Sequence, residues 1–201
     1  MRRPTLLRRP AGSRLAIADG APAAPPDGHR VALRLLERAD REEFLRLASE
    51  SRALHRPWTY PPERPEQFDE LYARSRRDDT VCLLACLRDG GEIAGVLIVS
   101  QIVRGAFQSA YLGYYAHERH AGRGYMREAM AQTIAYAFGP LGLHRLEANI
   151  QPGNAASIAL ARSSGFRLEG FSPRYLLIGG RWRDHERWAI TAEEWRGELR
   201  R

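Results

Sequence analysis

Short apolar runs, which are typical of buried strands, recur along most of the chain. They predict strands over Val31–Leu35, Val81–Leu87, Ile93–Val99, Ala110–Ala116 and His144–Ile150. The polar sequence Arg-Asp-Gly-Gly-Glu at residues 88–92 separates the second run from the third and predicts a hairpin. Three shorter runs predict closing strands over Leu168–Phe171, Arg174–Ile178 and Trp188–Ile190.

Between these runs, apolar residues recur every three or four positions, which is the spacing of amphipathic helices. The clearest stripe runs over Gly124–Phe138. A helix is also expected after Asp40, where Glu43 completes a capping-box pattern. Two more are expected over Pro65–Ser75, which opens on a favourable proline, and over residues 154–165, which open on an asparagine N-cap. This order of elements predicts a mixed α/β fold.

The chain carries 31 arginines, no lysine and 24 acidic residues, for a formal net charge of +7. The excess lies at the ends, because residues 1–18 hold five arginines and no acid, and residues 196–201 hold three arginines and one glutamate. Residues 19–195 hold 23 of each and are neutral. We expect a basic, Pro/Ala-rich extension over 1–28, one domain over 29–195 and a basic tail over 196–201. The ends suit weak RNA contact, but the body does not argue for a nucleic-acid-binding fold.

Cys82 and Cys86 lie four residues apart in an apolar run, so both face one side of a strand. They are too few for a disulfide framework and lack neighbouring metal ligands, so we expect core thiols, no metal and a cytoplasmic location. No apolar run approaches the ~18 residues of a membrane span, and no apolar segment of an export signal follows the first arginines. No triad pattern surrounds the histidines, and packed or surface positions are expected for His55, His117, His120, His144 and His185.

The segment 119–124, Arg-His-Ala-Gly-Arg-Gly, lies between a predicted strand and a predicted helix. Two glycines at alternate positions permit a tight turn whose N–H groups converge, and the helix N-terminus adds partial positive charge. This arrangement predicts an anion cradle. Its spacing matches neither a P-loop, which needs a lysine, nor the dinucleotide-binding glycine pattern.

Several motifs follow one another in order around this cradle. The Arg-x-x-Gly-x-Gly segment follows a strand with Tyr-Leu-Gly-Tyr at 111–114, and a helix opens on Asn-Ala-Ala-Ser at 154–157 before Gly-Phe at 165–166. Together they resemble the GNAT superfamily of N-acetyltransferases over roughly residues 30–195. Within it, Val-Arg-Gly-Ala-Phe at 103–107 and Trp-Arg-Asp-His at 182–185 are most similar to the RimJ/RimL type, which acetylates the N-termini of ribosomal proteins.

The resemblance implies a mostly antiparallel twisted sheet with a V-shaped splay between its central strands, helices on both faces, and acetyl-CoA as co-substrate. It implies that Ser157 protonates or hydrogen-bonds the departing sulfur. Main-chain groups would take the pantetheine amides and the pyrophosphate, and arginines and an asparagine would hold the CoA arm. The implied cofactor-binding residues are Tyr114, Tyr115, Ala116, Arg119, His120, Ala121, Gly122, Arg123, Gly124, Tyr125 and Asn154.

The general base is where the sequence departs from the family pattern. Tyr111 and Leu176 occupy or adjoin the positions where related enzymes carry a carboxylate. Glu147 is the first remaining candidate, followed by Glu169, Asp184 and a water relay. An α-amine has a pKa of about 8, against about 10.4 for a lysine amine, so a weak base site favours an N-terminal acceptor.

Three hypotheses follow, in order. The first is an acetyl-CoA-dependent acetyltransferase of a protein N-terminus, plausibly ribosomal, acting by direct amine attack as a monomer or homodimer. The second keeps the fold but takes a small amine, such as a polyamine or aminoglycoside. The third is a non-catalytic module that docks on RNA. Four residues are candidates for a peptide-accepting cleft: Trp58, Tyr60, Arg181 and Trp182.

Overall fold

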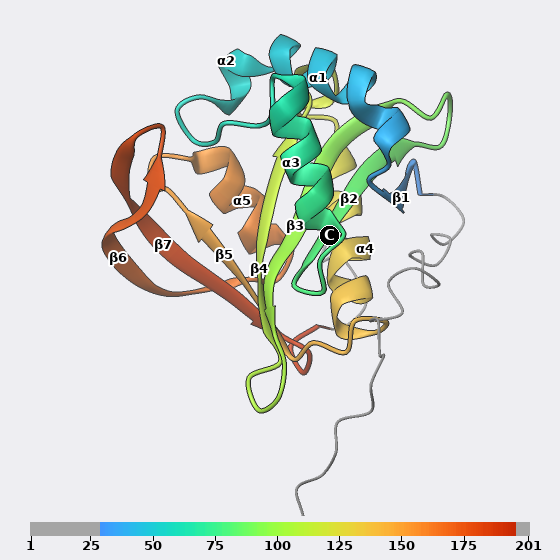
Figure 1. Ribbon diagram of the computed structural model, residues 1–201. Coiled ribbons are helices and arrows are strands. Elements are labelled where there is room, and N and C mark those ends of the chain that lie inside the picture. The colour runs from blue at the N-terminus through green and yellow to red at the C-terminus, as the bar shows by residue number, and fades with distance from the viewer. Residues whose placement is uncertain (1–28, 196–201) are drawn as a thin grey trace, which may run out of the picture.

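Seven strands form one sheet in the order β1-β2-β3-β4-β5-β7-β6 (Figure 1). The computed structural model describes residues 29–195, and within them β4 and β5 are the one parallel pair. The strands are β1 (Val31–Leu35), β2 (Thr80–Leu87), β3 (Ile93–Val103), β4 (Ser109–Ala116), β5 (Arg145–Ile150), β6 (Arg167–Ile178) and β7 (Arg181–Thr191). The first five predicted strands and the hairpin at residues 88–92 are therefore confirmed. The predicted basic ends, 1–28 and 196–201, lie outside the described residues.

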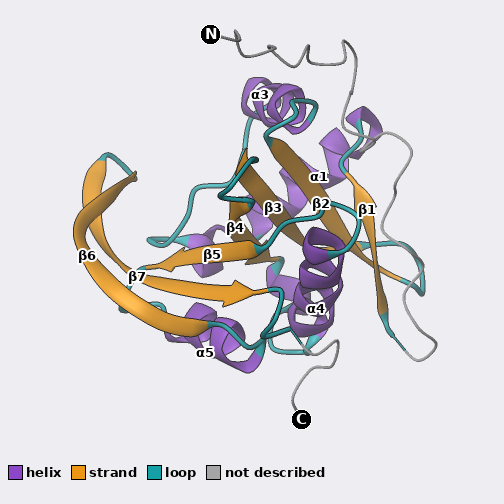
Figure 2. Ribbon diagram, turned by 90° about the horizontal axis from the view of Figure 1, so that it is seen from below, coloured by secondary structure: helices purple, strands orange, loops and turns teal. Residues whose placement is uncertain are grey.

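Helices cover both faces of the sheet (Figure 2). On one face lie α1 and α3, and on the other lie α4 and α5. The helices are α1 (Arg41–Glu50), α2 (Arg52–His55), α3 (Pro65–Ser75), α4 (Tyr125–Phe138) and α5 (Ala155–Ser163), with short 3-10 turns η1 (Arg38–Asp40) and η2 (Glu118–His120). None of these helices is both long and apolar enough to cross a membrane.

Strand β2 supplies side chains to two separate cores, one on each face of the sheet. Cys82, Leu84 and Cys86 pack with Phe44 and Phe68 beneath α1 and α3. The alternate residues of β2 face α4 instead, as the twofold periodicity of a strand requires. Both cysteines are buried and free, which confirms the prediction of core thiols, and burial raises the pKa of Cys82 to about 12.

The central strands separate in a V. Parallel pairing of β4 with β5 is limited to residues 109–111 against 145–147, and beyond these residues the two strands diverge (Figure 1). The opening faces the carboxyl ends of both strands. Because α4 follows β4 and α5 follows β5, both helices begin at this opening, and their N-terminal dipoles lie on either side of it.

Two local predictions are wrong. Asp40 does not cap α1 in a box with Glu43: its carboxylate accepts the N–H of Glu37 at 2.8 Å and pairs with Arg34 at 2.6 Å. Glu43 instead accepts the N–H of Ile93, at the start of β3, at 3.0 Å. Asp40 therefore caps the preceding turn η1 together with Glu37, and a tertiary partner takes the Glu43 carboxylate away from α1.

The predicted break between the closing strands is also wrong, because β6 runs continuously from Arg167 to Ile178. Its register against β7 shifts between Ser172 and Leu176, and Arg174 has a positive φ of 49°. A bulge of this kind absorbs the proline at 173, which an edge strand tolerates since one row of its N–H groups needs no partner. The strand predicted at Trp188–Ile190 is the end of the longer β7.

Candidate active site

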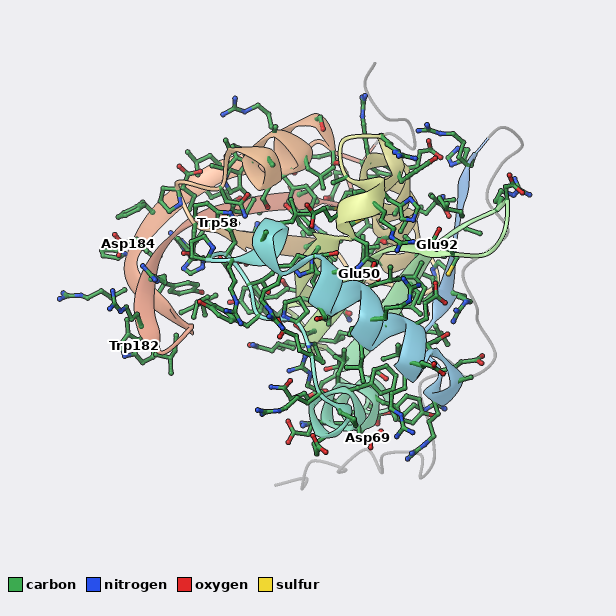
Figure 3. All side chains as sticks on the ribbon, turned by 90° about the horizontal axis from the view of Figure 1, so that it is seen from above. Glu50, Trp58, Asp69, Glu92, Trp182 and Asp184 are labelled. Carbon is green, nitrogen blue, oxygen red and sulfur yellow. The ribbon has the colours of Figure 1, made fainter. Side chains whose placement is uncertain are left out.

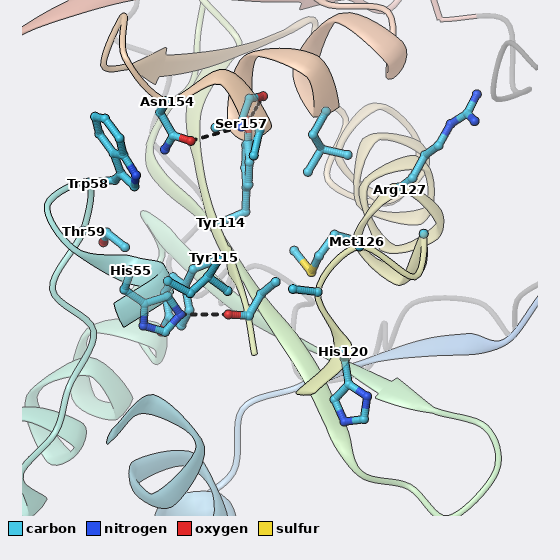
Figure 4. Close-up of a pocket in the computed structure, with 17 residues that line it drawn as sticks. His55, Trp58, Thr59, Tyr114, Tyr115, His120, Met126, Arg127, Asn154 and Ser157 are labelled. Atoms are coloured by element: carbon cyan, nitrogen blue, oxygen red, sulfur yellow. Dashed lines mark hydrogen bonds between the residues drawn. The ribbon is translucent and has the colours of Figure 1, made fainter. Parts of the chain in front are cut away.

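A cavity of about 380 Å³ lies at the open end of the splay (Figure 4). Its walls come from α2 and the loop after it, the end of β4, the turn before α4, and the first turns of α4 and α5. Among the described residues that line it, none carries a carboxylate and one is an arginine. The lining residues are Leu54, His55, Trp58, Thr59, Tyr114, Tyr115, Ala116, His120, Ala121, Gly122, Gly124, Met126, Arg127, Asn154, Ala156, Ser157 and Leu160.

The turn before α4, whose Gly122 and Gly124 line the cavity, carries a row of main-chain N–H groups that have no backbone acceptor among the described residues. Gly122 and Gly124 have φ values of 75° and 83°, a region of backbone space that favours glycine. Within residues 29–195, none of the five consecutive N–H groups from residue 122 to residue 126 donates to a backbone acceptor outside regular structure. Converging donors at a helix N-terminus fit a phosphate or pyrophosphate. The predicted turn geometry is therefore present.

The arginines around the cradle are arranged differently from the prediction. Arg119 does not line the cavity, because it pairs with Glu50 at 3.2 Å and with Glu92 at 3.7 Å, two residues labelled in Figure 3. Arg123 is also absent from the lining. Arg127 lines the cavity instead, and its buried Nε has no hydrogen-bond partner among the described residues. A cation in the first turn of a helix opposes the helix dipole, and this was the signal in the sequence that could have pointed to Arg127.

The predicted cradle residues His120 and Tyr125 lie on either side of the cavity wall. His120 lines the cavity, is buried, and approaches Glu92 at 3.3 Å. Tyr125 lies outside the lining, where its ring packs against His120 and sits beneath the guanidinium of Arg30 at 4.7 Å.

The end of β4 offers main-chain groups to the splay. The N–H of His117 donates to the carbonyl of Ala94 on β3 at 2.9 Å. Antiparallel strands alternate, so the main-chain groups of Tyr115 also face β3, whereas those of Tyr114 and Ala116 face the splay. Of the three residues predicted to pair with pantetheine amides, Tyr114 thus presents its N–H and its carbonyl to the splay, and Ala116 presents its N–H.

His55, which sequence reasoning did not assign to the site, fixes the end of this strand. Its Nε2 lies 2.8 Å from the carbonyl oxygen of Ala116. A carbonyl can only accept, so Nε2 carries the hydrogen and the tautomer is set. Burial lowers the pKa of His55 below its usual value, and the ring is neutral at neutral pH.

A second buried histidine, His117, lies behind the cavity wall, beside the lining residues His55 and Tyr115. The His117 ring is fully buried, and it lies 6.5 Å from His55 and 6.5 Å from Tyr115, measured between ring centroids. Burial is the main cause that lowers the pKa of His117 to about 3. His185 is buried and His144 is exposed, so all five histidines are packed or on the surface, as predicted.

Ser157 lies in the first turn of α5, at the other side of the splay. Its N–H donates to Asn154 Oδ1 at 3.2 Å, which confirms Asn154 as the N-cap. Its Oγ donates to the hydroxyl of Tyr114 at 2.9 Å, and that hydroxyl donates to the Ser157 carbonyl at 3.2 Å (Figure 4). Asn154, Ser157 and Tyr114 all line the cavity, so the structure brings these predicted residues together.

The candidate bases lie elsewhere. Glu147 accepts from Arg145 Nε at 2.8 Å, and Glu169 accepts from the same guanidinium. The hydrogen bond from Arg145 holds the pKa of Glu169 below its usual value. Neither carboxylate lines the cavity, so the structure does not bring the predicted base Glu147 together with Ser157.

The loop after α2 contacts both the turn that leads into α5 and the turn between β6 and β7. Trp58 lines the cavity, its carbonyl accepts from Gln151 Nε2 at 3.0 Å, and a Cβ on Gly153 would come within 3.0 Å of its ring. Tyr60 packs directly against Gly179 in the β6–β7 turn. The two aromatic residues predicted in this loop therefore have different surroundings, and only Trp58 reaches the cavity.

The other predicted cleft residues lie on the outer hairpin. Trp182 and Arg181 are exposed, and neither lines the cavity. Asp184 accepts the N–H of Arg174 at 2.7 Å, within the same hairpin (Figure 3). This region contributes no carboxylate to the cavity wall.

Comparison with known proteins gives a consistent result. A GNAT acetyltransferase domain model matches residues 30–167. The probable N-acetyltransferase YjcK of Bacillus subtilis is 33% identical over 171 residues, which cover 81% of this chain and 94% of that protein. The ribosomal protein uS5-alanine N-acetyltransferase of Escherichia coli is 42% identical over 107 residues, 53% of this chain and 55% of the relative, so that match spans about half of each protein.

A solved structure shares the whole architecture. RimJ of Mycobacterium smegmatis, determined in complex with CoA-disulfide, superposes with a TM-score of 0.74 at 32% identity, over 82% of this chain and 83% of that one. The splayed sheet, the glycine turn before α4 and the extent of the family match agree with one another. The chain belongs to the GNAT acetyltransferase family, and its reaction is acyl transfer from acetyl-CoA to an amine.

Proposed function

We propose that this enzyme acetylates the α-amine of a protein N-terminus, namely that of a ribosomal protein. The observation that carries the proposal is the absence of a carboxylate from the described cavity lining. About a tenth of α-amines are already neutral near pH 7, against fewer than one in a thousand lysine amines. A site without a strong base therefore suits an α-amine. The similarity to a uS5-alanine acetyltransferase and to RimJ supports the same acceptor class.

The cavity fits acetyl-CoA through groups of this chain. The free N–H groups of residues 122–126 would take the pyrophosphate, and the Arg127 guanidinium would add a charge-assisted contact to a phosphate. The main-chain N–H and carbonyl of Tyr114 and the N–H of Ala116 would pair with the amides of the pantetheine arm. Asn154 and Ser157 line the side toward which that arm would extend.

The transfer proceeds by direct attack of the amine on the thioester carbon. The carbon–nitrogen bond forms, the carbon–sulfur bond breaks, and the electron pair leaves on sulfur. Main-chain N–H groups at the end of β4 would polarise the carbonyl, and the Ser157 hydroxyl, which lines the cavity, would donate to the departing sulfur once its hydrogen is released from Tyr114. The amine proton passes to water, because Glu147 and Glu169 are both held by Arg145.

A small-amine acceptor is the alternative. Polyamines and aminoglycosides are polycations, and their recognition calls for acidic groups near the reacting amine. The described lining supplies none and includes Arg127. For the same enzyme we also propose a cytoplasmic location, supported by the two free buried thiols, and a weak RNA contact through the basic residues 1–18 and 196–201.

The test is a turnover screen with acetyl-CoA and short peptides that vary in their first two residues. Spermidine and an aminoglycoside serve as competing acceptors, and α-blocked peptides containing lysine serve as the matched control. We expect acetylation of free α-amines, with preference for particular first residues, and at least tenfold slower turnover of the polycations. Faster turnover of spermidine than of every peptide would overturn the proposal.

A further inference from the structure

Two reciprocal hydrogen bonds connect the sides of the splay at the reacting end of the cavity. The Ser157 Oγ–H donates to the Tyr114 hydroxyl at 2.9 Å, and the Tyr114 hydroxyl donates to the Ser157 carbonyl at 3.2 Å. Tyr114 comes from β4, which carries the main-chain groups of the site, and Ser157 comes from α5. The serine hydroxyl is therefore oriented by a residue of the opposite wall.

This arrangement matters because a serine hydroxyl has only one hydrogen. In the structure that hydrogen points at Tyr114, so it is not available to a sulfur atom in the cavity. If the tyrosine hydroxyl turned from the Ser157 carbonyl to Ser157 Oγ, it would become the donor of the pair. The serine hydrogen would then be free, and Oγ would stay anchored by the same partner.

We propose that Tyr114 is the positioning residue for Ser157: its hydroxyl turns to donate to Ser157 Oγ and so directs the serine hydrogen at the departing sulfur. This inference rests on the proposed role of Ser157 in acetyl transfer. No covalent bond forms to either residue. The amine proton goes to water, the thiolate takes a proton from solvent after it leaves, and both hydroxyls keep their own protons.

The acidity of the two partners supports donation rather than proton transfer. Burial raises the pKa of Tyr114 to about 12. A thiol has a pKa of about 8.5, so the equilibrium leaves the proton on tyrosine by roughly three thousandfold. Tyr114 therefore stays protonated at any working pH, and it remains a hydrogen-bond donor throughout the reaction.

The experiment compares Tyr114→Phe, Ser157→Ala and the double variant. Phenylalanine keeps the ring and removes only the hydroxyl. We expect Tyr114→Phe to lower kcat about tenfold and Ser157→Ala to lower it by about 30-fold, with KM for acetyl-CoA within about twofold in both. Because Tyr114 acts through Ser157, the double variant should equal Ser157→Ala alone. Tyr136→Phe, which removes the hydroxyl of a buried tyrosine on α4, is the matched control and should leave kcat unchanged.

Additive losses in the double variant would overturn the proposal, as would a loss confined to KM. If no peptide is acetylated, the proposed acceptor class is wrong. The slow hydrolysis of acetyl-CoA, in which water is the acceptor, then still measures departure of the thiolate in the same variants. If Tyr114→Phe does not fold, 3-fluorotyrosine at position 114 keeps the ring and the hydroxyl while lowering the phenol pKa. We then expect an alkaline loss of kcat that the wild type does not show in its working pH range, and a pH profile unchanged from that of the wild type would overturn the assignment.

Discussion

The cavity wall and the outer face of strands β5 to β7 differ in which polar groups they contain and in whether those groups are paired. The cavity wall is built from hydroxyls, imidazoles and main-chain groups, with Arg127 as its one described arginine. The outer face contains carboxylates, but each is paired: Arg145 is held between Glu147 and Glu169, and Arg167 also contacts Glu169 at 2.6 Å.

The difference teaches that a carboxylate near a splayed strand is not by itself a catalytic base. Glu147 lies on β5 directly across from Tyr111, close to where the strands part, yet its side chain is paired with Arg145. A carboxylate held by a guanidinium is a poor proton acceptor, since the pairing favours its charged form. The chemistry is therefore left to groups that position and polarise.

The largest expected effect tests whether the cavity wall depends on its glycine turn. Gly124→Val places a β-branched side chain at a φ of 83° in the cradle, and should weaken acetyl-CoA binding by roughly 30-fold or more. Calorimetric titration with acetyl-CoA measures it. Gly91→Val, at a φ of 73° in the β2–β3 turn, is the control with similar backbone strain and should bind normally. Equal losses of acetyl-CoA affinity in both variants would show that the glycine turn does not bind the cofactor.

The next prediction concerns stability, which the buried histidines beside the cavity and the ion pairs of the outer face should lose over different ranges of pH. The folded pKa of His117, about 3, lies below the unfolded value of about 6.5, so its stabilising contribution is present above pH 6.5 and is lost progressively as the pH falls toward 3. The unfolding free energy should drop by about 1.4 kcal/mol between pH 7.5 and pH 5.5. The ion pairs of Glu169 lose strength only below about pH 4.5, because the hydrogen bond from Arg145 lowers the pKa of Glu169.

Urea unfolding at the two pH values measures this slope. His117→Gln removes the titrating group and should flatten the dependence, with His55 supplying what remains. A variant with the same slope as the wild type would show that the pH dependence lies elsewhere.

A smaller effect is expected from Glu147→Gln, which addresses the outer face directly. Loss of one partner from a half-buried pair should lower Tm by about 3 °C, whereas kcat should stay within about twofold. Thermal melting and steady-state kinetics on one preparation give both numbers. A fall in kcat of about 100-fold would make Glu147 the base and break the comparison.

The smallest effect on turnover is expected when both cysteines are replaced. Cys82→Ala with Cys86→Ala should lower stability through cavities beneath α1 and α3, but should leave the acetyl-transfer rate nearly unchanged. Mass spectrometry after incubation with labelled acetyl-CoA checks for an acyl-enzyme. A labelled acetyl group on either thiol would contradict direct attack.

Much of the fold could be predicted from periodicity, because the apolar positions of runs such as Val81–Leu87 and of the stripe at 124–138 are the positions that the fold buries. What periodicity could not supply was the choice of partner for polar side chains. Glu43 accepts a hydrogen bond from the N–H of Ile93, fifty residues away, and Arg119 forms ion pairs with Glu50 and Glu92. Such pairings depend on tertiary placement, which local spacing does not encode.

The site was predictable to the same depth. The turn at 122–124 and the N-cap Asn154 have local backbone requirements, and both were identified from sequence. His55 was not, because its role comes from a contact with Ala116 across 61 positions. The pairing of the predicted base Glu147 is local by contrast: Arg145 lies two positions earlier on β5, so the alternation of the strand puts both side chains on one face.

The contact between Trp58 and Gly153 has a mechanical consequence. The tryptophan stands on the turn that leads into α5, and its carbonyl is tied to Gln151 in the same turn. An acceptor that pushes this ring aside will also displace Asn154 and the first turn of α5, and Ser157 with them. Acceptors that differ only in bulk at Trp58 should consequently differ in the rate at which thiolate departs, so that selectivity is expressed in turnover as well as in affinity.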